Sequence, residues 1–330
     1  TKVYGAYHGI KGVLDDQLLC MDEEDRAELD RLPYTPSSAL GSCRYKIKDP
    51  DEDDTDYKRV IEVFKKYDVH YFFYAGGNDS MDTCDKISKY MQKSGYDINV
   101  IGIPKTIDND LCGTDHCPGY GSAAKYIANS IMEVNRDAVI YGSPLVIVVE
   151  IMGRNAGWLA AASKLAEVGG YGADLIYLPE LPFSYEKFKS DVKKVTDRKK
   201  ICVVAVSEGI RFESGKYVGD DGSMTDAFGH SQLGGVCGVL KAKVKELGLK
   251  CKAIELNILQ RCAAHCASET DVEESFAAGR TAVKAAVGGE TDKMISFKRK
   301  DGSVYEIEYV ATPLSAAANA EKTIPLGWIT

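Results

Sequence analysis

The sequence predicts an α/β fold in which parallel sheets are covered by helices on both faces. Apolar segments of strand length alternate along the chain with amphipathic segments of helix length. Residues 144–151 (PLVIVVEI) are almost continuously apolar, which is typical of a strand buried on both faces. Polar, glycine-rich segments follow the predicted strands, at the edge where open parallel sheets bind ligands.

The first half of the chain contains two strand–helix units. Residues 69–76 predict a buried strand that ends in glycines, and residues 81–95 predict a helix closed by a glycine. Residues 98–103 predict the next strand. A long polar loop over residues 104–121 then leads into a helix over residues 122–135.

The second half repeats this alternation. Its predicted strands are residues 144–151, 175–178, 200–206 and 251–259. Residues 157–169 predict an alanine-rich helix, and the chain becomes helical again from Ser231. Residues 211–230 predict a hairpin or a flexible connection.

Composition excludes several classes of protein. The 330 residues include 49 acidic and 41 basic side chains, a net charge of −8, which argues against nucleic-acid and anionic-membrane partners. A polyanionic substrate would therefore need a locally basic site. No apolar run approaches the roughly 20 residues of a membrane span, and the first 14 residues lack the apolar core of a signal peptide. We expect a cytoplasmic protein.

The ten cysteines contain no CxxC pair, and we expect reduced thiols rather than disulfides. Two clusters combine cysteine with histidine: Cys112, His116 and Cys117, and Cys262, His265 and Cys266. Neither has the paired spacing of a structural zinc site, so we expect small buried thiols instead.

Two loops after neighbouring strands carry the residues of a phosphate site. In residues 76–80 (GGNDS), two glycines let the backbone approach a ligand, and the following helix offers free N–H groups to an anion. Residues 104–110 (PKTIDND) concentrate charge. Lys105 can bind phosphate oxygens, while Asp108 and Asp110 can divide between holding Mg²⁺ and accepting a hydroxyl proton. The other interpretation is that these polar residues only form turns.

Three later strand ends add further polar groups. Residues 152–157 (MGRNAG) place Arg154 between glycines, where its guanidinium can grip a phosphate with two hydrogen bonds. Glu208 ends one strand and Arg261 another. Together, five strand ends present charged or glycine-rich groups to what would be one cleft.

In this order and at these intervals, GGNDS, PKTIDND, EIMGRNAG, VSEG and LQR resemble the motif set of phosphofructokinases. GSCR at residues 41–44 resembles their GS-x-R turn, and the match runs from Val3 to about Gly289. The resemblance implies two Rossmann-like parallel-sheet lobes with an active site in the cleft between them. It implies a phosphoryl-donor lobe (1–140), a fructose 6-phosphate lobe (141–290) and a segment returning to the first lobe (291–330).

The roles of individual residues follow from this resemblance. It implies Asp108 as the base that accepts the proton of the sugar 1-hydroxyl, with Thr106 and Arg154 beside it in catalysis. The residues implied to bind fructose 6-phosphate are Thr106, Asp108, Met152, Gly153, Arg154, Glu208, Lys252 and Arg261. Those implied to bind pyrophosphate are Arg44, Gly77, Asn78, Asp79, Ser80 and Lys105. Asp110 and Asn78 would hold Mg²⁺, the implied cofactor.

Two positions select the phosphoryl donor in this family. Relatives that use ATP usually carry glycine where this chain has Asp79 and Lys105. The Asp79 carboxylate would repel the nucleotide's α-phosphate, and Lys105 would attract the short, highly charged pyrophosphate. The chain therefore resembles the pyrophosphate-dependent branch, whose reaction runs in both directions.

The chain departs from the family pattern in several places. Asn78 stands where many relatives have an aspartate that binds Mg²⁺, and Lys252 and Ile258 stand where short ATP-using relatives have arginine and histidine. We expect the family's first strand and glycine-rich loop, a unit of roughly 30 residues, to be missing. We also expect the family's closing helices to lie beyond Thr330.

Three alternatives remain open at this stage. They are an ATP-dependent phosphofructokinase, a non-catalytic regulatory subunit of the same family, and a nucleotide-binding module of another family that reuses the sheet. The family also implies a homo-oligomer, either a dimer or a tetramer.

Overall fold

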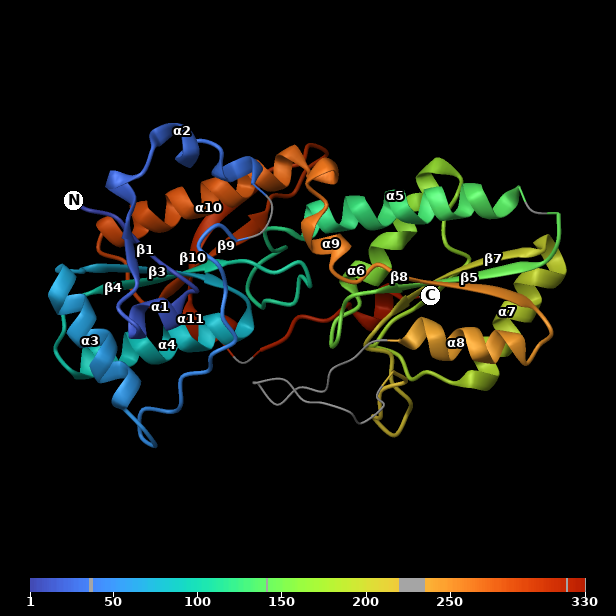
Figure 1. Cartoon of the computed structure of the whole chain (residues 1–330), viewed down its shortest axis with the longest axis horizontal. Coiled ribbons are helices and arrows are strands. Elements are labelled where there is room, and N and C mark those ends of the chain that lie inside the picture. The colour runs from blue at the N-terminus through green and yellow to red at the C-terminus, as the bar shows by residue number, and fades with distance from the viewer. Residues whose placement is uncertain (36–37, 141, 220–234, 319, 330) are drawn as a thin grey trace. The chain divides into compact units, whose positions relative to one another are not determined.

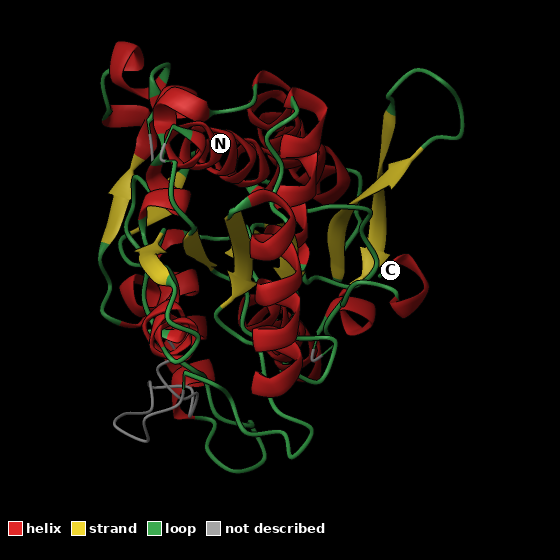
Figure 2. Ribbon diagram, turned by 90° about the vertical axis from the view of Figure 1, so that its right-hand side faces the viewer, coloured by secondary structure: helices red, strands yellow, loops and turns green. Residues whose placement is uncertain are grey.

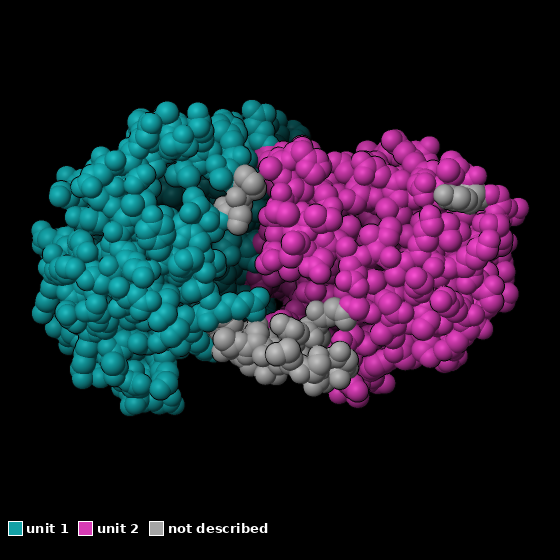
Figure 3. Space-filling view, in the orientation of Figure 1, with its two compact units in different colours: residues 1–106, 111–119, 269–321 teal, residues 107–110, 120–268, 322–330 magenta. Residues whose placement is uncertain are grey.

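The computed structural model describes residues 1–35, 38–140, 142–219, 235–318 and 320–329 (Figure 1). Two compact units make up the chain, and both are discontinuous in sequence (Figure 3). Unit 1 contains residues 1–106, 111–119 and 269–321, and unit 2 contains residues 107–110, 120–268 and 322–330. Among the described residues, no helix is long and apolar enough to cross a membrane.

Unit 1 is built on a four-stranded sheet in the order β10-β9-β4-β3. Its strands are β3 (Tyr71–Gly76), β4 (Asn99–Pro104), β9 (Lys293–Arg299) and β10 (Ile307–Pro313). The helices of this unit are α1 (Ile10–Leu14), α2 (Arg26–Leu29), α3 (Thr55–Tyr67), α4 (Asn78–Lys93), α10 (Glu269–Val287) and α11 (Leu314–Ala317). A separate antiparallel pair joins β1 (Tyr4–Ala6) to β2 (Leu18–Cys20).

Alternating apolar side chains give the unit 1 sheet two buried faces. Val100 of β4 packs in a core with Phe64 of α3 and Ile87 of α4. The next residue, Ile101, packs in a second core with Ala282 of α10. Successive strand residues point to opposite faces, so each face needs its own helices.

Unit 2 is built on a four-stranded parallel sheet in the order β6-β7-β5-β8. Its strands are β5 (Leu145–Ile151), β6 (Leu175–Tyr177), β7 (Ile201–Ser207) and β8 (Lys250–Glu255). The helices are α5 (Tyr120–Val139), α6 (Trp158–Ala162), α7 (Tyr185–Lys199), α8 (Val236–Lys245) and α9 (Leu259–Cys262). Figure 2 shows helices on either side of the strands.

The predicted α/β class is confirmed, with several differences in detail. Residues 293–299 and 307–313 form β9 and β10, which the hydrophobic pattern did not predict; β10 runs antiparallel to β9, so the unit 1 sheet is mixed. The strand predicted over residues 251–259 ends at Glu255, and Leu259 begins α9 instead. Residues 163–169 continue the predicted alanine-rich helix as a 3₁₀ helix.

The boundaries of the units differ from the expected ranges 1–140, 141–290 and 291–330. α5 belongs to unit 2 because it packs on β5, α6 and α9, and α10 belongs to unit 1 because it packs on β4 and β9. Residues 269–321 form part of unit 1, in which β9 pairs with β4.

The connection predicted over residues 211–230 is described only in part. Arg211 and Tyr217 pair across a short antiparallel turn, and Phe212 N donates to Lys216 O at 2.9 Å. Residues 220–234, which include Ser231, lie outside the described residues. The described cysteines are all free thiols, as expected. The expectation of buried thiols in the two Cys/His clusters holds only for Cys117, since Cys112 and Cys266 are half-buried and Cys262 is exposed.

Candidate functional site

In unit 1, the ends of β3 and β4 bring two predicted loops together. Gly76 lies beside Pro104 in the parallel register, and Lys105 N donates to Gly76 O at 2.9 Å. The residue that follows β3, Gly77, is the N-cap of α4. A Cβ on Gly76 would lie 2.0 Å from Ser80 Oγ, so only glycine allows α4 to begin this close to the strand.

The first turn of α4 contains the sequence-predicted residues Asn78, Asp79 and Ser80. The backbone N–H groups at the start of a helix and the helix dipole suit an anion at this end. Asp79 is exposed there, and its backbone carbonyl accepts a hydrogen bond from Thr83 Oγ1 at 2.9 Å. This helix start therefore combines anion-binding backbone with one acidic side chain.

Lys105 and Thr106 lie next to this helix start. Lys105 O and Thr106 Cβ are each 3.8 Å from the position a Cβ on Gly77 would take, and the Lys105 side chain is exposed. Arg44 is also exposed, in the segment that precedes α3. Unit 1 thus presents a lysine and a helix N-terminus at one sheet edge, a combination suited to phosphate.

In unit 2, hydrogen bonds tie the end of β5 to its neighbours. Gly153 N donates to Glu208 Oε1 at 3.3 Å, and Met152 N donates to Gln260 Oε1 at 3.3 Å. Ser207 Oγ donates to Gly153 O. Gly153 has φ +134°, a backbone conformation that side-chain-bearing residues rarely adopt. The MGRNAG turn is therefore held rigidly against the end of β7.

Arg154 is held by the same turn. A Cβ on Gly209 would lie 1.8 Å from Arg154 O, so Gly209 permits this close backbone approach. Within the described residues, Arg154 Nε is buried and has no hydrogen-bond partner. A buried guanidinium N–H without an acceptor is costly, and an anionic ligand would satisfy it.

Glu208 has a perturbed acidity. The pKa of Glu208 is raised to about 7, first by burial and then by the nearby carboxylates of Asp108 and Glu150, while the Gly153 N–H and Arg154 act in the opposite direction. The two predicted site residues Asp108 and Glu208 are therefore close enough to interact electrostatically.

The loop that carries Asp108 and Asp110 is fixed by a late segment of the chain. Lys322 N donates to Asp110 O at 2.7 Å, and Lys322 Nζ donates to Asn109 Oδ1 at 3.4 Å. The indole N–H of Trp158 donates to Lys322 O at 2.8 Å. Asn109 is buried with φ +57°, so the loop is shaped by tertiary contacts.

The predicted residues are not all brought together. Lys252 lies three residues before the end of β8, and its ammonium is 3.6 Å from the Asp137 carboxylate. Arg261 lies in α9, next to Gln260, beyond the end of that strand. Asn78 and Asp110, the predicted metal ligands, belong to different units.

The sequence interpretation missed the roles of Gln260, Ser207 and Lys322. Gln260 and Ser207 stand in the quoted strand-end motifs, so their position was a usable signal. Lys322 lies more than 200 residues from the loop it holds, and no local pattern marks it.

Comparisons with known proteins agree with this geometry. The model of the Phosphofructokinase family matches residues 1–286. The chain is 44% identical to the pyrophosphate–fructose 6-phosphate 1-phosphotransferase of Halomonas elongata, over 99% of this chain and 79% of that protein. It is 45% identical to the enzyme of the same name from Xanthomonas campestris, over 98% of this chain and 78% of that protein.

A solved structure shares the fold over the whole chain. The crystal structure of a pyrophosphate-dependent phosphofructokinase from Nitrosospira multiformis superposes with a TM-score of 0.89 and 41% identity, covering 100% of this chain and 79% of that one. The motifs, the fold and these relatives agree, and the chain belongs to the phosphofructokinase family.

Proposed function

We propose that this protein transfers a phosphoryl group reversibly from pyrophosphate to the 1-hydroxyl of fructose 6-phosphate. The products are fructose 1,6-bisphosphate and phosphate. The observation that carries this proposal is the pair Asp79 and Lys105, an aspartate at the start of α4 and a lysine hydrogen-bonded through its backbone to Gly76 beside it. The names of the relatives in the Halomonas and Xanthomonas species support the same reaction.

Unit 1 supplies the donor site in this proposal. The start of α4, with Gly77, Asn78 and Ser80, binds the oxygens of pyrophosphate together with Lys105 and Arg44. The exposed Asp79 carboxylate disfavours a nucleotide, because the α-phosphate of ATP would meet a like charge there. Pyrophosphate has no third phosphate to place at that point.

Unit 2 supplies the sugar site. The buried Arg154 guanidinium has a donor N–H to offer a phosphate oxygen, and the Glu208 carboxylate can accept hydrogen bonds from sugar hydroxyls. Met152 and Gly153 lie in the turn that is hydrogen-bonded to Gln260 and Glu208. We place Arg261 at the 6-phosphate, and we leave Lys252 out of this set because it pairs with Asp137 away from the strand end.

Asp108 is the proposed base, with Thr106 beside it in the sequence. The Asp108 carboxylate takes the proton of the 1-hydroxyl, the 1-oxygen bonds to the near phosphorus of pyrophosphate, and the bond from that phosphorus to the bridging oxygen breaks. The departing phosphate carries the electron pair of that bond. Lys105, Arg44 and Arg154 offset charge on the phosphoryl oxygens, so positioning and electrostatics provide most of the acceleration.

Magnesium is the proposed cofactor. Asp110 offers a carboxylate from a loop fixed by Lys322, and carboxylate oxygens together with phosphate oxygens are the ligands that Mg²⁺ prefers. Bound Mg²⁺ would neutralise phosphate charge. Asn78 contributes at most an amide oxygen, so we assign the larger share of metal binding to Asp110 and the substrate.

We also propose that the protein forms a homo-oligomer. Phe276, Val283 and Val287 of α10 are 57%, 48% and 65% exposed, and their spacing of seven and four residues places them on one helix face. A second copy of the chain would cover this face. Light scattering coupled to size exclusion tests the proposal, and a monomer at micromolar concentration would refute it.

The function is tested by following fructose 6-phosphate phosphorylation with Mg²⁺ and either pyrophosphate or ATP. Turnover with pyrophosphate and a much lower kcat/KM with ATP is the expected result. Turnover with ATP alone would leave the family assignment standing and overturn the donor assignment. Binding of fructose 6-phosphate without turnover by either donor would point to a regulatory subunit.

A further inference from the structure

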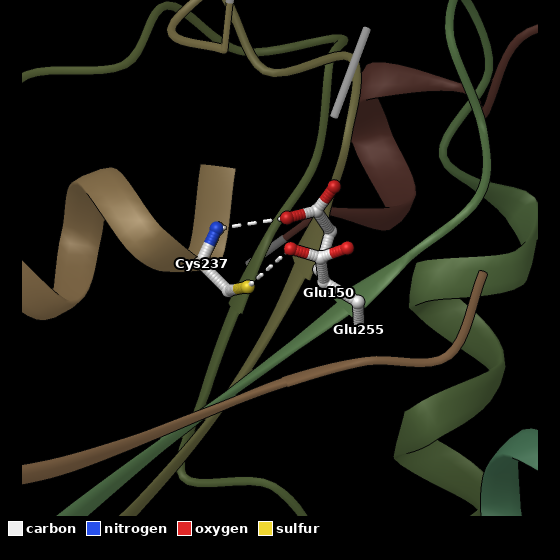
Figure 4. A group of neighbouring side chains, drawn as sticks. All are labelled: Glu150, Cys237 and Glu255. Atoms are coloured by element: carbon white, nitrogen blue, oxygen red, sulfur yellow. Dashed lines mark hydrogen bonds between the residues drawn. The ribbon is translucent and has the colours of Figure 1, made fainter. Parts of the chain in front are cut away.

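Three potential metal ligands meet in unit 2, at residues that the proposed reaction does not use. Glu150 of β5, Cys237 of α8 and Glu255 of β8 point toward one another (Figure 4). One ligand atom from each lies within 4.8 Å of the other two. Among the described residues, this is the one group of three or more such side chains, and neither Cys/His cluster of the sequence analysis forms another.

The parallel pairing of β5 and β8 creates the cluster. Glu150 and Glu255 are directly opposite each other in the register, so their side chains share one face of the sheet. Val146 and Val148 of the same face pack on α8, which brings the first turn of that helix over the carboxylates. Gly235 caps the helix in the left-handed conformation, and Cys237 follows in the first turn.

Two hydrogen bonds fix the arrangement. Cys237 N donates to Glu150 Oε2 at 2.8 Å, and Cys237 Sγ donates to Glu255 Oε1 at 3.7 Å. The Cys237 N–H contacts only Oε2 of Glu150, which leaves the other carboxylate oxygen of Glu150 outside this hydrogen bond. Each of the three residues can therefore direct one atom toward a shared ion.

The cluster is electrostatically unfavourable without a cation. Like charges directly opposite on paired strands repel, and Glu150 and Cys237 are only 6% and 2% exposed. A divalent cation would offset the charge of the two carboxylates.

We propose that Glu150, Cys237 and Glu255 bind one divalent transition-metal ion of the zinc class. Tetrahedral zinc with Zn–S near 2.3 Å and Zn–O near 2.1 Å places sulfur and oxygen about 3.6 Å apart, and Cys237 Sγ lies 3.7 Å from Glu255 Oε1. A thiolate ligand favours zinc over magnesium and calcium. Water completes the tetrahedron, and the exposed Glu255 gives the ion a path from solvent.

Binding replaces a proton with the metal. The Cys237 S–H bond breaks, sulfur keeps the electron pair and bonds to the ion, and the proton passes to solvent. The ion would link β5, β8 and α8, and its ligand Glu150 precedes the Met152–Gly153 turn by two residues. This inference does not depend on the proposed function.

Cobalt(II) titration of the whole, metal-free protein tests the site. We expect one ion per chain, a thiolate-to-cobalt charge-transfer band, and displacement of cobalt by zinc but not by a large excess of magnesium. Glu255→Gln is a suitable variant because Glu255 is exposed and should not be needed for folding. Cys237→Ser removes the sulfur. Each should weaken zinc binding at least about tenfold, and Cys237→Ser should abolish the charge-transfer band.

Cys251→Ser provides the matched control, because Cys251 lies on β8 outside the cluster. It should leave the zinc affinity and the thiolate-to-cobalt charge-transfer band unchanged. The proposal is overturned if the wild-type protein gives no thiolate band, or if the band survives Cys237→Ser. It is also overturned if Cys251→Ser removes the band, since another thiol would then be the ligand.

Discussion

The backbone N–H of Gly153 donates a hydrogen bond to the Glu208 carboxylate across the ends of β5 and β7, at 3.3 Å. This contact links the MGRNAG turn to a carboxyl group whose pKa is raised to about 7, first by burial. Both residues belong to the proposed sugar site. The acidity of Glu208 should therefore appear in the pH dependence of substrate binding.

We predict that the KM for fructose 6-phosphate rises as pH falls through about 7. Protonation of Glu208 removes the carboxylate that accepts from Gly153 and from the sugar. Glu208→Gln should raise KM about tenfold or more, through loss of a charged hydrogen bond, and flatten this pH dependence. Steady-state kinetics between pH 6 and 8 measure both effects. An unchanged profile in the variant would assign the titration to another group.

Glu208 should also influence stability. Its folded pKa is higher than its ordinary value of 4.5, so the folded state binds the proton more tightly than the unfolded state. The stabilisation is complete below 4.5 and is lost as pH rises through about 7. Glu208→Gln should therefore unfold at a higher temperature than the wild type above pH 7. Thermal melts across this range test the sign, and a variant with a lower melting temperature at pH 8 would contradict it.

Gly209→Ala should impair the sugar site without any change of charge. A Cβ there would lie 1.8 Å from the Arg154 carbonyl oxygen, so the Arg154 backbone must move. We expect kcat/KM to fall at least about tenfold, equivalent to about 1.4 kcal/mol. Gly238→Ala in α8 is the control, because among the described residues its Cβ would meet no atom within 4 Å. Similar kinetics for the two variants would refute this account of Gly209.

His116 provides a second pH-dependent contact, in unit 1. Its ring nitrogens lie 2.9 Å from an Asp115 oxygen and 2.8 Å from a Glu274 oxygen. Burial lowers the pKa of His116, but these two carboxylates raise it more, so the net shift is upward from 6.5. The stabilisation is full below 6.5 and is lost as pH rises through the folded value. In His116→Gln, the free energy of unfolding should no longer show this decrease as pH rises. A pH dependence equal to that of the wild type would argue against the contact.

Lys252 and Arg261 should respond differently to neutralisation. Arg261→Met should raise the KM for fructose 6-phosphate by about 10- to 100-fold, the effect of losing a charged hydrogen bond. Lys252→Met should change KM by less than about threefold, because the exposed pair with Asp137 contributes little. Equal effects would show that Lys252 reaches the sugar phosphate in a way that its pairing with Asp137 does not indicate.

The periodic elements of the fold could be predicted from the sequence because burial on both faces leaves nearly continuous apolar strands. Residues 145–151 are an example, since every one of them is buried. β10 could not be predicted in this way. Its residues 307–313 are only half-buried or exposed, and an edge strand needs little apolar surface. The end of β8 was also misplaced, because Leu256, Ile258 and Leu259 are apolar although the chain turns into α9.

The functional residues, like the fold, could be predicted from the sequence only where local signals mark them. Glycine positions and charged residues at strand ends are local signals, so Gly153, Arg154, Glu208 and Lys105 could be recognised. The Glu150–Cys237 contact joins residues 87 positions apart, and the register between β5 and β8 places Glu255 opposite Glu150. No local pattern encodes that register, so the cluster became visible only in the folded chain.

The most direct test of the pyrophosphate assignment is the ratio of kcat/KM for pyrophosphate to kcat/KM for ATP in wild type and Asp79→Gly. Asp79→Asn serves as the matched variant that keeps the size and removes the charge. We predict a wild-type ratio far above one, and a fall of at least about 100-fold in Asp79→Gly, equivalent to about 2.7 kcal/mol. A wild-type ratio near one, or a ratio that both substitutions leave unchanged, would contradict the role of Asp79 in selecting the donor.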